Sequence, residues 1–225
     1  MTQEVWTSVD QYINGLFFRS DPVLDASLEA SRKAGLPPIQ VSPPQGKLLH
    51  LLARMQGARR ILEIGTLGGY STIWMARALP PGGRLLTLEA DSRHADVARA
   101  NFALAGFAEV IELHLGPALE TLPRVAAEGH GPFDLIFIDA NKSSMAEYFD
   151  WALELSRPGS VILADNVIRD GAVVQAASKD PDIQGVRRFN ERLAAEPRVS
   201  ATEIQTVGSK GYDGFALAVV LGGPK

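Results

Sequence analysis

Three oxygen-bearing side chains stand at the ends of two short apolar runs in the second half of the chain. Asp139 ends the run DLIFIDA, and Asp165 and Asn166 end the run SVILADN. If these runs are neighbouring strands, which lie about 4.8 Å apart, the three side chains converge. Carboxylate and amide oxygens without histidine or cysteine suit a hard cation, Mg²⁺ first and Mn²⁺ or Ca²⁺ as alternatives. The spacing therefore predicts a divalent-metal site.

A lysine follows the first of these carboxylates at a spacing of three residues. Lys142 is placed at the mouth of the site that Asp139 begins, within reach of an oxygen bound to the metal. Like charge disfavours the charged form of an ammonium beside a divalent cation, so Lys142 is a credible base. Lys142 and Asp139 are the catalytic candidates, and an exposed lysine at a helix start is the alternative interpretation.

A glycine turn and two carboxylates indicate a cofactor site. Gly65 opens the turn in ILEIGTLGGYST, where a ligand can approach the backbone at a helix N-terminus. The spacing G-x-x-G-G differs from the G-x-G-x-x-G of dinucleotide-binding folds. Glu89 ends RLLTLEA, where a carboxylate can accept both hydroxyls of a ribose, although a solvated strand end is the alternative. Because Glu63 is placed to meet a cationic ligand, S-adenosylmethionine (SAM) fits better than NAD.

Five apolar runs alternate with helix-length segments from Arg60 onward. The runs are RILEIG, RLLTLEA, EVIELHLG, DLIFIDA and SVILADN. Parallel neighbours need long crossovers, so the alternation predicts an α/β fold with a doubly wound, Rossmann-like sheet and helices on both faces. Residues 199–207 and 214–221 are separated only by GSKGYD, too short for a crossover helix. They should form an antiparallel hairpin, which puts one reversed strand at the end of a mostly parallel sheet.

The N-terminal part of the chain has helical periodicity. Apolar residues recur at spacings of three and four, at Trp6, Val9, Ile13 and Phe17. This pattern predicts an amphipathic helix. An exposed apolar face on that helix would favour a homodimer, because large apolar patches seldom remain open to water.

Two further helices are expected before the sheet. Asp21-Pro22 predicts a helix start, and Gly35 predicts its end. Residues 36–44 contain four prolines, so they should be extended, and a third helix should span about 45–55. We expect one domain over residues 1–225, with an N-terminal helical extension and lid over 1–56 and a cofactor-binding α/β core over 57–225.

Composition and charge exclude several classes of protein. The 225 residues carry a net charge of −4 with scattered basic residues, which disfavours nucleic acid as a partner. The sequence has no cysteine, which excludes disulfides, thiolate metal sites and cysteine nucleophiles. Without a run of about 18 apolar residues or an export signal, we expect a cytoplasmic protein that does not enter a membrane.

Taken together, the motifs resemble those of the metal-dependent O-methyltransferases of the catechol and caffeoyl-CoA type. ILEIGTLGGYST, TLEAD, FDLIFIDANK, ILADNVIRDGAV and DGFALA occur in the family's order and spacing, from about residue 41 to the C-terminus. The resemblance implies methyl transfer from SAM to a hydroxyl of a small phenolic acceptor, catechol-like or caffeoyl-type. It implies that Asp139, Asp165 and Asn166 hold the metal. It implies that the cofactor site is lined by Val41, Glu63, Gly65, Thr66, Tyr70, Ser71, Glu89, Ala118 and Asp139.

Two residues depart from the family's pattern. Most bacterial and plant relatives read Asp-Ala-Asp-Lys, whereas this chain has Asn141 at the third position, so a carboxylate near the metal is missing. Ala118 stands where some relatives place a serine against the adenine. Neither departure removes an expected metal ligand.

The expected chemistry is an in-line displacement of the methyl group by an oxyanion. A phenol ionises only near pH ~10, so chelation of adjacent oxygens by a metal must lower that value while Lys142 accepts the proton. Orienting oxygen, carbon and sulfur can contribute about 7–11 kcal/mol. Three alternatives stay open: a nicotinamide-dependent oxidoreductase, a catalytically silent cofactor-binding or metal-sensing module, and a nucleic-acid methyltransferase.

Overall fold

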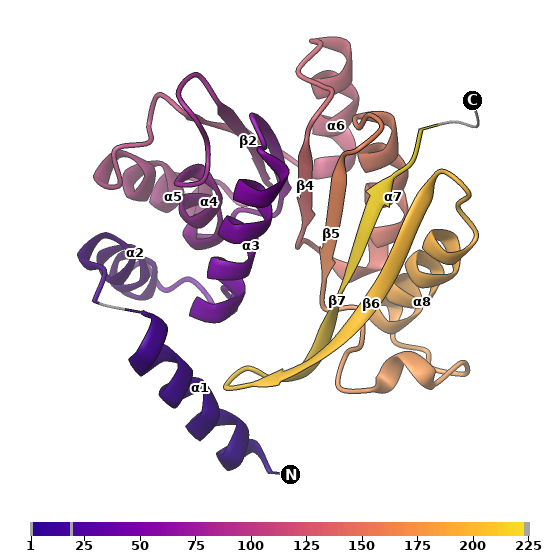
Figure 1. Cartoon of the computed structure of the whole chain (residues 1–225), viewed down its shortest axis with the longest axis horizontal. Helices are drawn as coiled ribbons and strands as arrows, with labels where there is room; N and C mark the ends of the chain where they lie inside the picture. Colours follow the sequence, from indigo (N-terminus) through magenta and orange to yellow (C-terminus); the bar gives the residue numbers. More distant parts are fainter. Residues whose placement is uncertain (1, 19, 223–225) are drawn as a thin grey trace.

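A seven-stranded sheet forms the centre of this computed structural model, which describes residues 2–18 and 20–222 (Figure 1). The strands are β1 Arg60–Ile64, β2 Arg84–Glu89, β3 Ile111–Leu115, β4 Leu135–Ile138, β5 Val161–Asp165, β6 Val199–Gly208 and β7 Gly211–Val220. Their order in the sheet is β3-β2-β1-β4-β5-β7-β6. The first five pair in parallel, whereas β7 is antiparallel to both β5 and β6. The predicted sheet, with one reversed strand, is confirmed.

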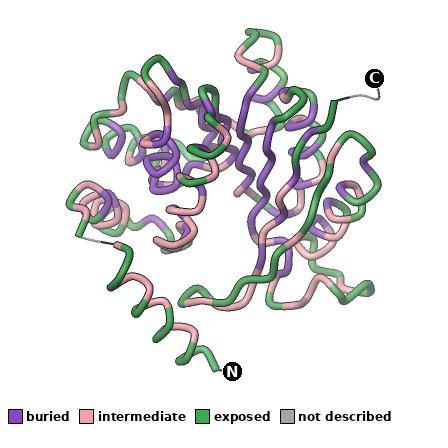
Figure 2. Tube along the Cα trace, in the orientation of Figure 1, coloured by how far each residue is buried: buried purple, intermediate pink, exposed green. Residues whose placement is uncertain are grey.

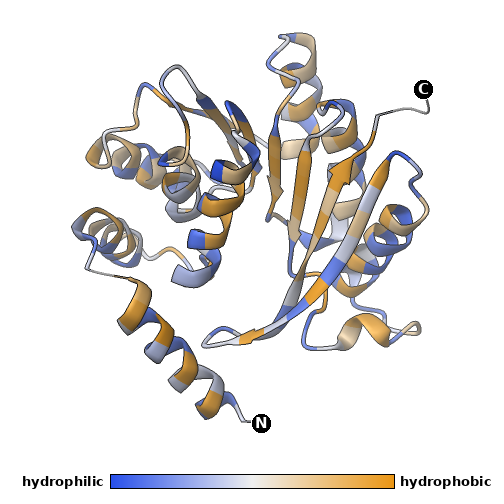
Figure 3. Ribbon diagram, in the orientation of Figure 1, coloured by the Kyte–Doolittle hydropathy of each residue, from blue (hydrophilic) through white to orange (hydrophobic). Residues whose placement is uncertain are grey.

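Each face of the sheet has its own hydrophobic cluster, because alternate residues of a strand point to opposite faces. Ile61 of β1 packs with α3 Pro43–Gln56, α4 Tyr70–Ala76 and α5 Ser92–Leu104. Leu62 packs with α6 Ala118–Ala127, α7 Met145–Glu154 and α8 Pro181–Ala194. Figure 2 shows the central strands buried, and Figure 3 shows them predominantly hydrophobic. The prediction of helices on both faces is confirmed.

The closing hairpin turns more tightly than the sequence pattern indicates. Ser209 and Lys210 alone form the turn, since Gly208 and Gly211 already pair across the two strands. The predicted start of the last strand at Gly214 is therefore wrong by three residues. A glycine inside a strand can mark a close approach of neighbouring groups. A Cβ on Gly214 would lie 2.5 Å from the Ile168 side chain and 2.5 Å from the Ile204 carbonyl oxygen.

The N-terminal helices cap one end of the molecule. They are α1 Gln3–Phe17, α2 Pro22–Lys33 and α3. α2 begins as predicted, with Asp21 accepting a hydrogen bond from the backbone N–H of Leu24. α3 begins two residues before its predicted start, because Ser42 caps it and the following prolines fit the first turn.

α1 stands apart from the body of the protein and touches the hairpin tip (Figure 1). Gln3 donates a hydrogen bond to the carbonyl oxygen of Gly208 at 2.9 Å, and the Ser209 N–H donates to Asp10 at 2.7 Å. The helix itself has no buried residue. Across the described residues, no helix is long and apolar enough to cross a membrane.

Candidate active site

Two of the predicted metal ligands lie at one edge of the sheet. β4 and β5 are adjacent, and Ile138 pairs with Ala164, so the residues that follow, Asp139 and Asp165, stand at the same end of neighbouring strands. Asp165 is buried, and burial raises its pKa to about 7, with the negative charge of Asp139 adding to the rise. The two carboxylates therefore repel each other in a poorly solvated position, which is a suitable environment for a cation.

Lys142 lies against this pair. It begins the short 3₁₀ helix η1 Lys142–Ser144, and its Nζ is 2.8 Å from Oδ1 of Asp139. The residue is only 7% exposed, so the alternative of an exposed lysine is wrong. α8 approaches η1 so closely that a Cβ on Gly185 would lie 2.2 Å from the Lys142 carbonyl oxygen. This packing fixes the backbone from which the lysine reaches the carboxylate.

The loop after β5 is held in an unusual conformation. Asn166 has a φ of 63°, in the left-handed region, and its N–H donates to Oδ1 of Asp165 at 2.9 Å. Oδ1 of Asp213, on β7, accepts hydrogen bonds from the N–H groups of Ile168 and Arg169 at 3.0 and 2.9 Å. Asparagine tolerates the left-handed conformation better than most residues. Asn166 is thus placed beside Asp165, while its role as a ligand stays a prediction.

The glycine turn is packed against the protein itself. A Cβ on Gly65, whose φ is 102°, would lie 2.0 Å from the Asp139 carbonyl oxygen, and one on Gly69 would lie 2.4 Å from the Phe102 ring. On the side where a Cβ would stand, neighbouring backbone and side chains fill the space, while the approach of a ligand to the turn stays a prediction. The turn thereby brings the end of β1 into contact with the end of β4, next to the carboxylate pair.

Glu63 lies fully buried on β1, beneath the start of α4. Its carboxylate accepts hydrogen bonds from Ser71 at 2.6 Å, Thr72 at 2.5 Å and Thr87 at 2.8 Å. Burial raises the pKa of Glu63 to about 7 despite these three donors. Thr66 joins the network through a 2.6 Å contact with Thr87. Glu63 holds β1, β2 and α4 together, and its predicted contact with the cofactor stays a prediction.

This raised pKa gives a stability prediction. The folded protein retains the Glu63 proton up to about pH 7, whereas the unfolded chain releases it near 4.5. Its contribution is therefore complete below pH 4.5 and is lost as the pH rises through 7. Between these values the unfolding free energy of the unmodified protein should fall by roughly 3 kcal/mol relative to Glu63→Gln. Urea titrations at several pH values measure this difference, and parallel curves would contradict the assignment.

Glu89 holds the glycine turn from the end of β2. Its Oε2 accepts from the N–H of Leu67 at 2.7 Å, and its Oε1 accepts from the N–H of Asp91 at 2.9 Å. Glu89 is 9% exposed, so the alternative of a solvated strand end is wrong. Its carboxylate is fixed where β2 ends, which is the position predicted for a ribose ligand.

The remaining predicted cofactor residues lie around the same edge of the sheet. Val41 is buried between α2 and α3, and Tyr70 and Ser71 are buried at the start of α4. Ala118 is half-buried at the first position of α6. The side chain of Asn141, which directly precedes η1, donates to Ser143 and Ser144 of η1 and accepts from Tyr148 of α7. The family departure at position 141 therefore lies in a local hydrogen-bond network.

Two residues near the carboxylates were missed by sequence reasoning. Gln45, at the start of α3, stabilises the charged form of Asp165 and partly offsets its raised pKa. Lys210, at the hairpin tip, donates to the Pro38 carbonyl oxygen at 2.7 Å. Burial lowers the pKa of Lys210, while the charge of Asp139 opposes that change. The hairpin tip therefore contacts the segment before α3 and feels the charge of Asp139, and no spacing motif links it to that residue.

Comparisons with known proteins show the family of this chain. A protein-family model described as O-methyltransferase matches residues 19–219. The chain belongs to this family. It is 54% identical over 220 residues to "Catechol O-methyltransferase" of Niastella koreensis, covering 98% of this chain and 100% of that protein. The predicted family and enzyme class, an O-methyltransferase, are thereby confirmed, and the nicotinamide-dependent oxidoreductase is set aside.

Solved O-methyltransferase structures share the whole fold. The Bacillus cereus O-methyltransferase in complex with SAH superposes with a TM-score of 0.96 at 56% identity, covering 97% of this chain and 100% of that one. The O-methyltransferase TomG of Streptomyces achromogenes, in complex with SAM, has a TM-score of 0.95 at 55% identity, covering 99% and 100%. This O-methyltransferase therefore matches both relatives over nearly its full length.

Proposed function

We propose that this O-methyltransferase transfers the methyl group of SAM to a hydroxyl of a small catechol-like acceptor at a divalent-metal site formed by Asp139, Asp165 and Asn166. The observation that carries the proposal is the buried Asp165 carboxylate beside Asp139, with the Lys142 ammonium 2.8 Å from the latter. The catechol O-methyltransferase of Niastella koreensis supports the acceptor class. The SAM and SAH complexes of the two superposed structures support the methyl donor.

The donor set fits a hard cation. Asp139 and Asp165 supply carboxylate oxygens, and Asn166 supplies an amide oxygen on the adjoining residue. A divalent ion would relieve the repulsion that, with burial, keeps the Asp165 pKa high. When bound, such an ion would polarise the acceptor hydroxyl and so favour its ionisation.

The chain's own residues supply proton transfer, orientation and exclusion of water. Lys142 Nζ, held beside Asp139, would act as the neutral amine, which a nearby divalent cation favours over the ammonium, and would take the proton from the acceptor hydroxyl. Glu89, fixed by two backbone N–H groups, would hold the ribose of SAM, whose sulfonium supplies the methyl group. The segment around Val41 and the hairpin tip at Lys210 would close the site over the acceptor. Orientation of the reacting atoms is the largest expected contribution, about 7–11 kcal/mol.

A labelled-methyl assay tests the proposal. The full chain is incubated with radiolabelled SAM and matched pairs of acceptors that have two adjacent hydroxyls or only one, with and without a chelator. We expect methylation of the catechols at least about 100-fold above the single-hydroxyl compounds, loss in chelator and recovery with Mg²⁺. Full activity after chelation, with no metal remaining in the protein, would contradict the metal's role. Equal rates on both acceptor classes would contradict the catechol assignment.

We also propose that two chains associate through α1. Its exposed apolar residues lie on one stripe at Val5, Val9, Tyr12 and Leu16, and Tyr12 is 68% exposed. A contiguous apolar stripe of this kind favours association. Sedimentation velocity should therefore give a dimer for the unmodified protein and a monomer for Val9→Glu/Tyr12→Glu. Gln11→Glu, which adds charge to the same helix off the stripe, should remain a dimer. A monomeric unmodified protein would refute the proposal.

A further inference from the structure

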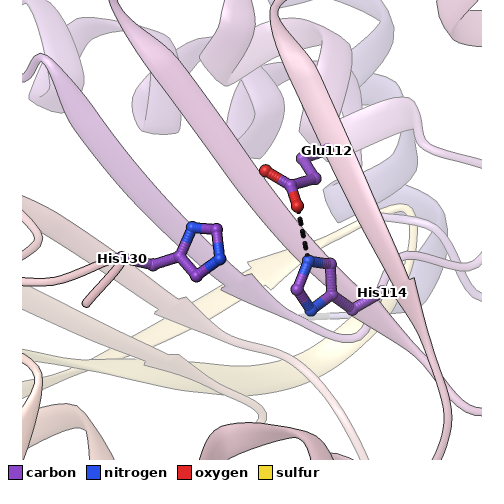
Figure 4. Close-up of side chains that lie close together, drawn as sticks. All are labelled: Glu112, His114 and His130. Carbon is purple, nitrogen blue, oxygen red and sulfur yellow. Dashed lines mark hydrogen bonds and ion pairs between the residues drawn. The ribbon is translucent and has the colours of Figure 1, made fainter. Parts of the chain in front are cut away.

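Three side chains of types that can bind a metal ion lie close together at the edge strand of the sheet (Figure 4). Glu112 and His114 belong to β3, and His130 belongs to the loop between α6 and β4. One carboxylate oxygen and one nitrogen of each imidazole lie within 4.8 Å of one another. β1 and β2 separate β3 from the strands that bear the carboxylate pair.

The fold holds these three side chains together for simple reasons. Alternate residues of a strand point to the same face, so Glu112 and His114 lie side by side. After α6 the chain turns at Gly129, whose φ is 73°, and this turn places His130 next to β3. Arg60 fixes this return, because its Nη1 donates to the carbonyl oxygens of His130 and Gly131 at 3.2 and 2.9 Å.

Each imidazole is already paired with a carboxylate. Nε2 of His114 is 2.7 Å from Glu112, and Nε2 of His130 is 3.1 Å from Glu128. The two rings stand 5.5 Å apart between centroids, nearly perpendicular at 85°. Glu128 can orient the His130 ring and raise its basicity, as a carboxylate partner commonly does for a metal-binding histidine. The contact between His114 and Glu112 would instead be replaced by bonds from both groups to the ion. The His114 and His130 side chains are 18% and 29% exposed, so the group is accessible to an ion from solvent yet partly shielded.

Two arginines near the group keep their positive charge, but their guanidinium groups donate to backbone carbonyl oxygens. Arg60 and Arg84 line a small hollow, about 180 Å³ in volume, that also contains Glu112 and His130. Arg60 is engaged with the backbone as described, and Nη1 of Arg84 donates to the Glu109 carbonyl oxygen. The two negative charges of Glu112 and Glu128, which lie beside the imidazoles, offset the two positive charges of the arginines.

We propose that Glu112, His114 and His130 form a second metal site, selective for a borderline transition-metal ion such as Zn²⁺. Two imidazole nitrogens with a carboxylate oxygen are typical zinc ligands, whereas the oxygen-only set at Asp139 and Asp165 suits Mg²⁺. Glu128 either supplies a fourth ligand or orients His130. The ion would tie the edge strand to the loop between α6 and β4 and so stabilise the folded protein.

Calorimetric titration with Zn²⁺, in buffer containing excess Mg²⁺, tests this site on the full chain. We expect the unmodified protein to bind one equivalent that persists in Asp165→Asn and is lost in His114→Gln/His130→Gln. His50→Gln, which removes an imidazole elsewhere, should retain it. Zn²⁺ should also raise the Tm of the unmodified protein but not that of the double variant. Equal Zn²⁺ uptake by the double variant and the unmodified protein, or loss of all uptake in Asp165→Asn, would overturn the proposal.

Cobalt spectroscopy gives a second readout that depends on the ligands themselves. Co²⁺ bound by imidazole nitrogens should give visible absorption bands in the unmodified protein and in Asp165→Asn. The single variant His130→Gln, which changes only a loop residue, should weaken these bands even if the double variant folds poorly. Identical spectra for His130→Gln and the unmodified protein would show that His130 is not a ligand and would refute the site.

Discussion

Replacing Asp165 with asparagine should lower kcat for catechol methylation by about 1,000-fold and leave the Kd for SAM within about threefold. Asparagine has nearly the same shape but lacks the negative charge that holds a divalent ion. A loss of about 4 kcal/mol of transition-state stabilisation corresponds to this factor. Rates are measured at saturating Mg²⁺ with labelled SAM, and the Kd is measured by calorimetry.

Asp170→Asn is the matched control for this substitution. Asp170 lies in the same loop, is exposed, and has a φ of 54° that asparagine tolerates. We expect its kcat to stay within about twofold, because an exposed substitution away from the site removes no buried contact. Folding is not expected to limit Asp165→Asn, since Asp165 is buried with a raised pKa and its charge is unfavourable without a cation. Retention of one tenth or more of kcat in folded Asp165→Asn would contradict the assigned role.

Replacing Lys142 with glutamine should reduce kcat by about 100- to 10,000-fold, the usual contribution of a positioned acid or base. Because Lys142 is 2.8 Å from Asp139, the substitution could instead act by displacing that carboxylate. Two measurements separate these roles. If Lys142 is the base, the Mg²⁺ concentration for half-maximal activity stays unchanged. The loss should also shrink for a nitro-substituted catechol, whose hydroxyl ionises more readily.

Lys179→Gln serves as the control, because Lys179 is an exposed lysine in the loop before α8. We expect it to retain full activity with both acceptors. The contrary result is that Lys142→Gln loses equal activity with catechol and nitrocatechol and needs a higher Mg²⁺ concentration for half-maximal activity. That result would assign Lys142 to positioning Asp139 and not to proton transfer.

Sequence periodicity was sufficient to predict the strands that position the site. β4 and β5 are short apolar runs ending in polar residues, and parallel strands place such ends together. The convergence of Asp139 and Asp165 therefore followed from local pattern and a general rule of α/β sheets. The burial of Lys142 did not follow, because α8 packs its Gly185 against the backbone of Lys142 and Ser143, a contact between segments far apart in the chain.

Long-range contacts account for most of what sequence reasoning missed. Thr87 on β2 and Thr72 on α4 donate two of the hydrogen bonds that Glu63 accepts. Neither threonine stands at a recognisable sequence spacing from Glu63. The hairpin tip lies beyond the carboxyl end of β5 because β7 pairs with β5 in reverse, and the charge of Asp139 acts on the pKa of Lys210 there. The close approach of the Asp139 carbonyl oxygen to Gly65 is another such contact, and the role of Gly65 in cofactor binding stays a prediction.

The most direct measurement of the central claim is anomalous diffraction from crystals of the full chain grown with SAH and Mn²⁺. We predict an anomalous peak within about 2.5 Å of side-chain oxygens from Asp139, Asp165 and Asn166. Asp139 and Asp165 turned away from each other, with no peak between them at saturating Mn²⁺, would contradict the account of this O-methyltransferase.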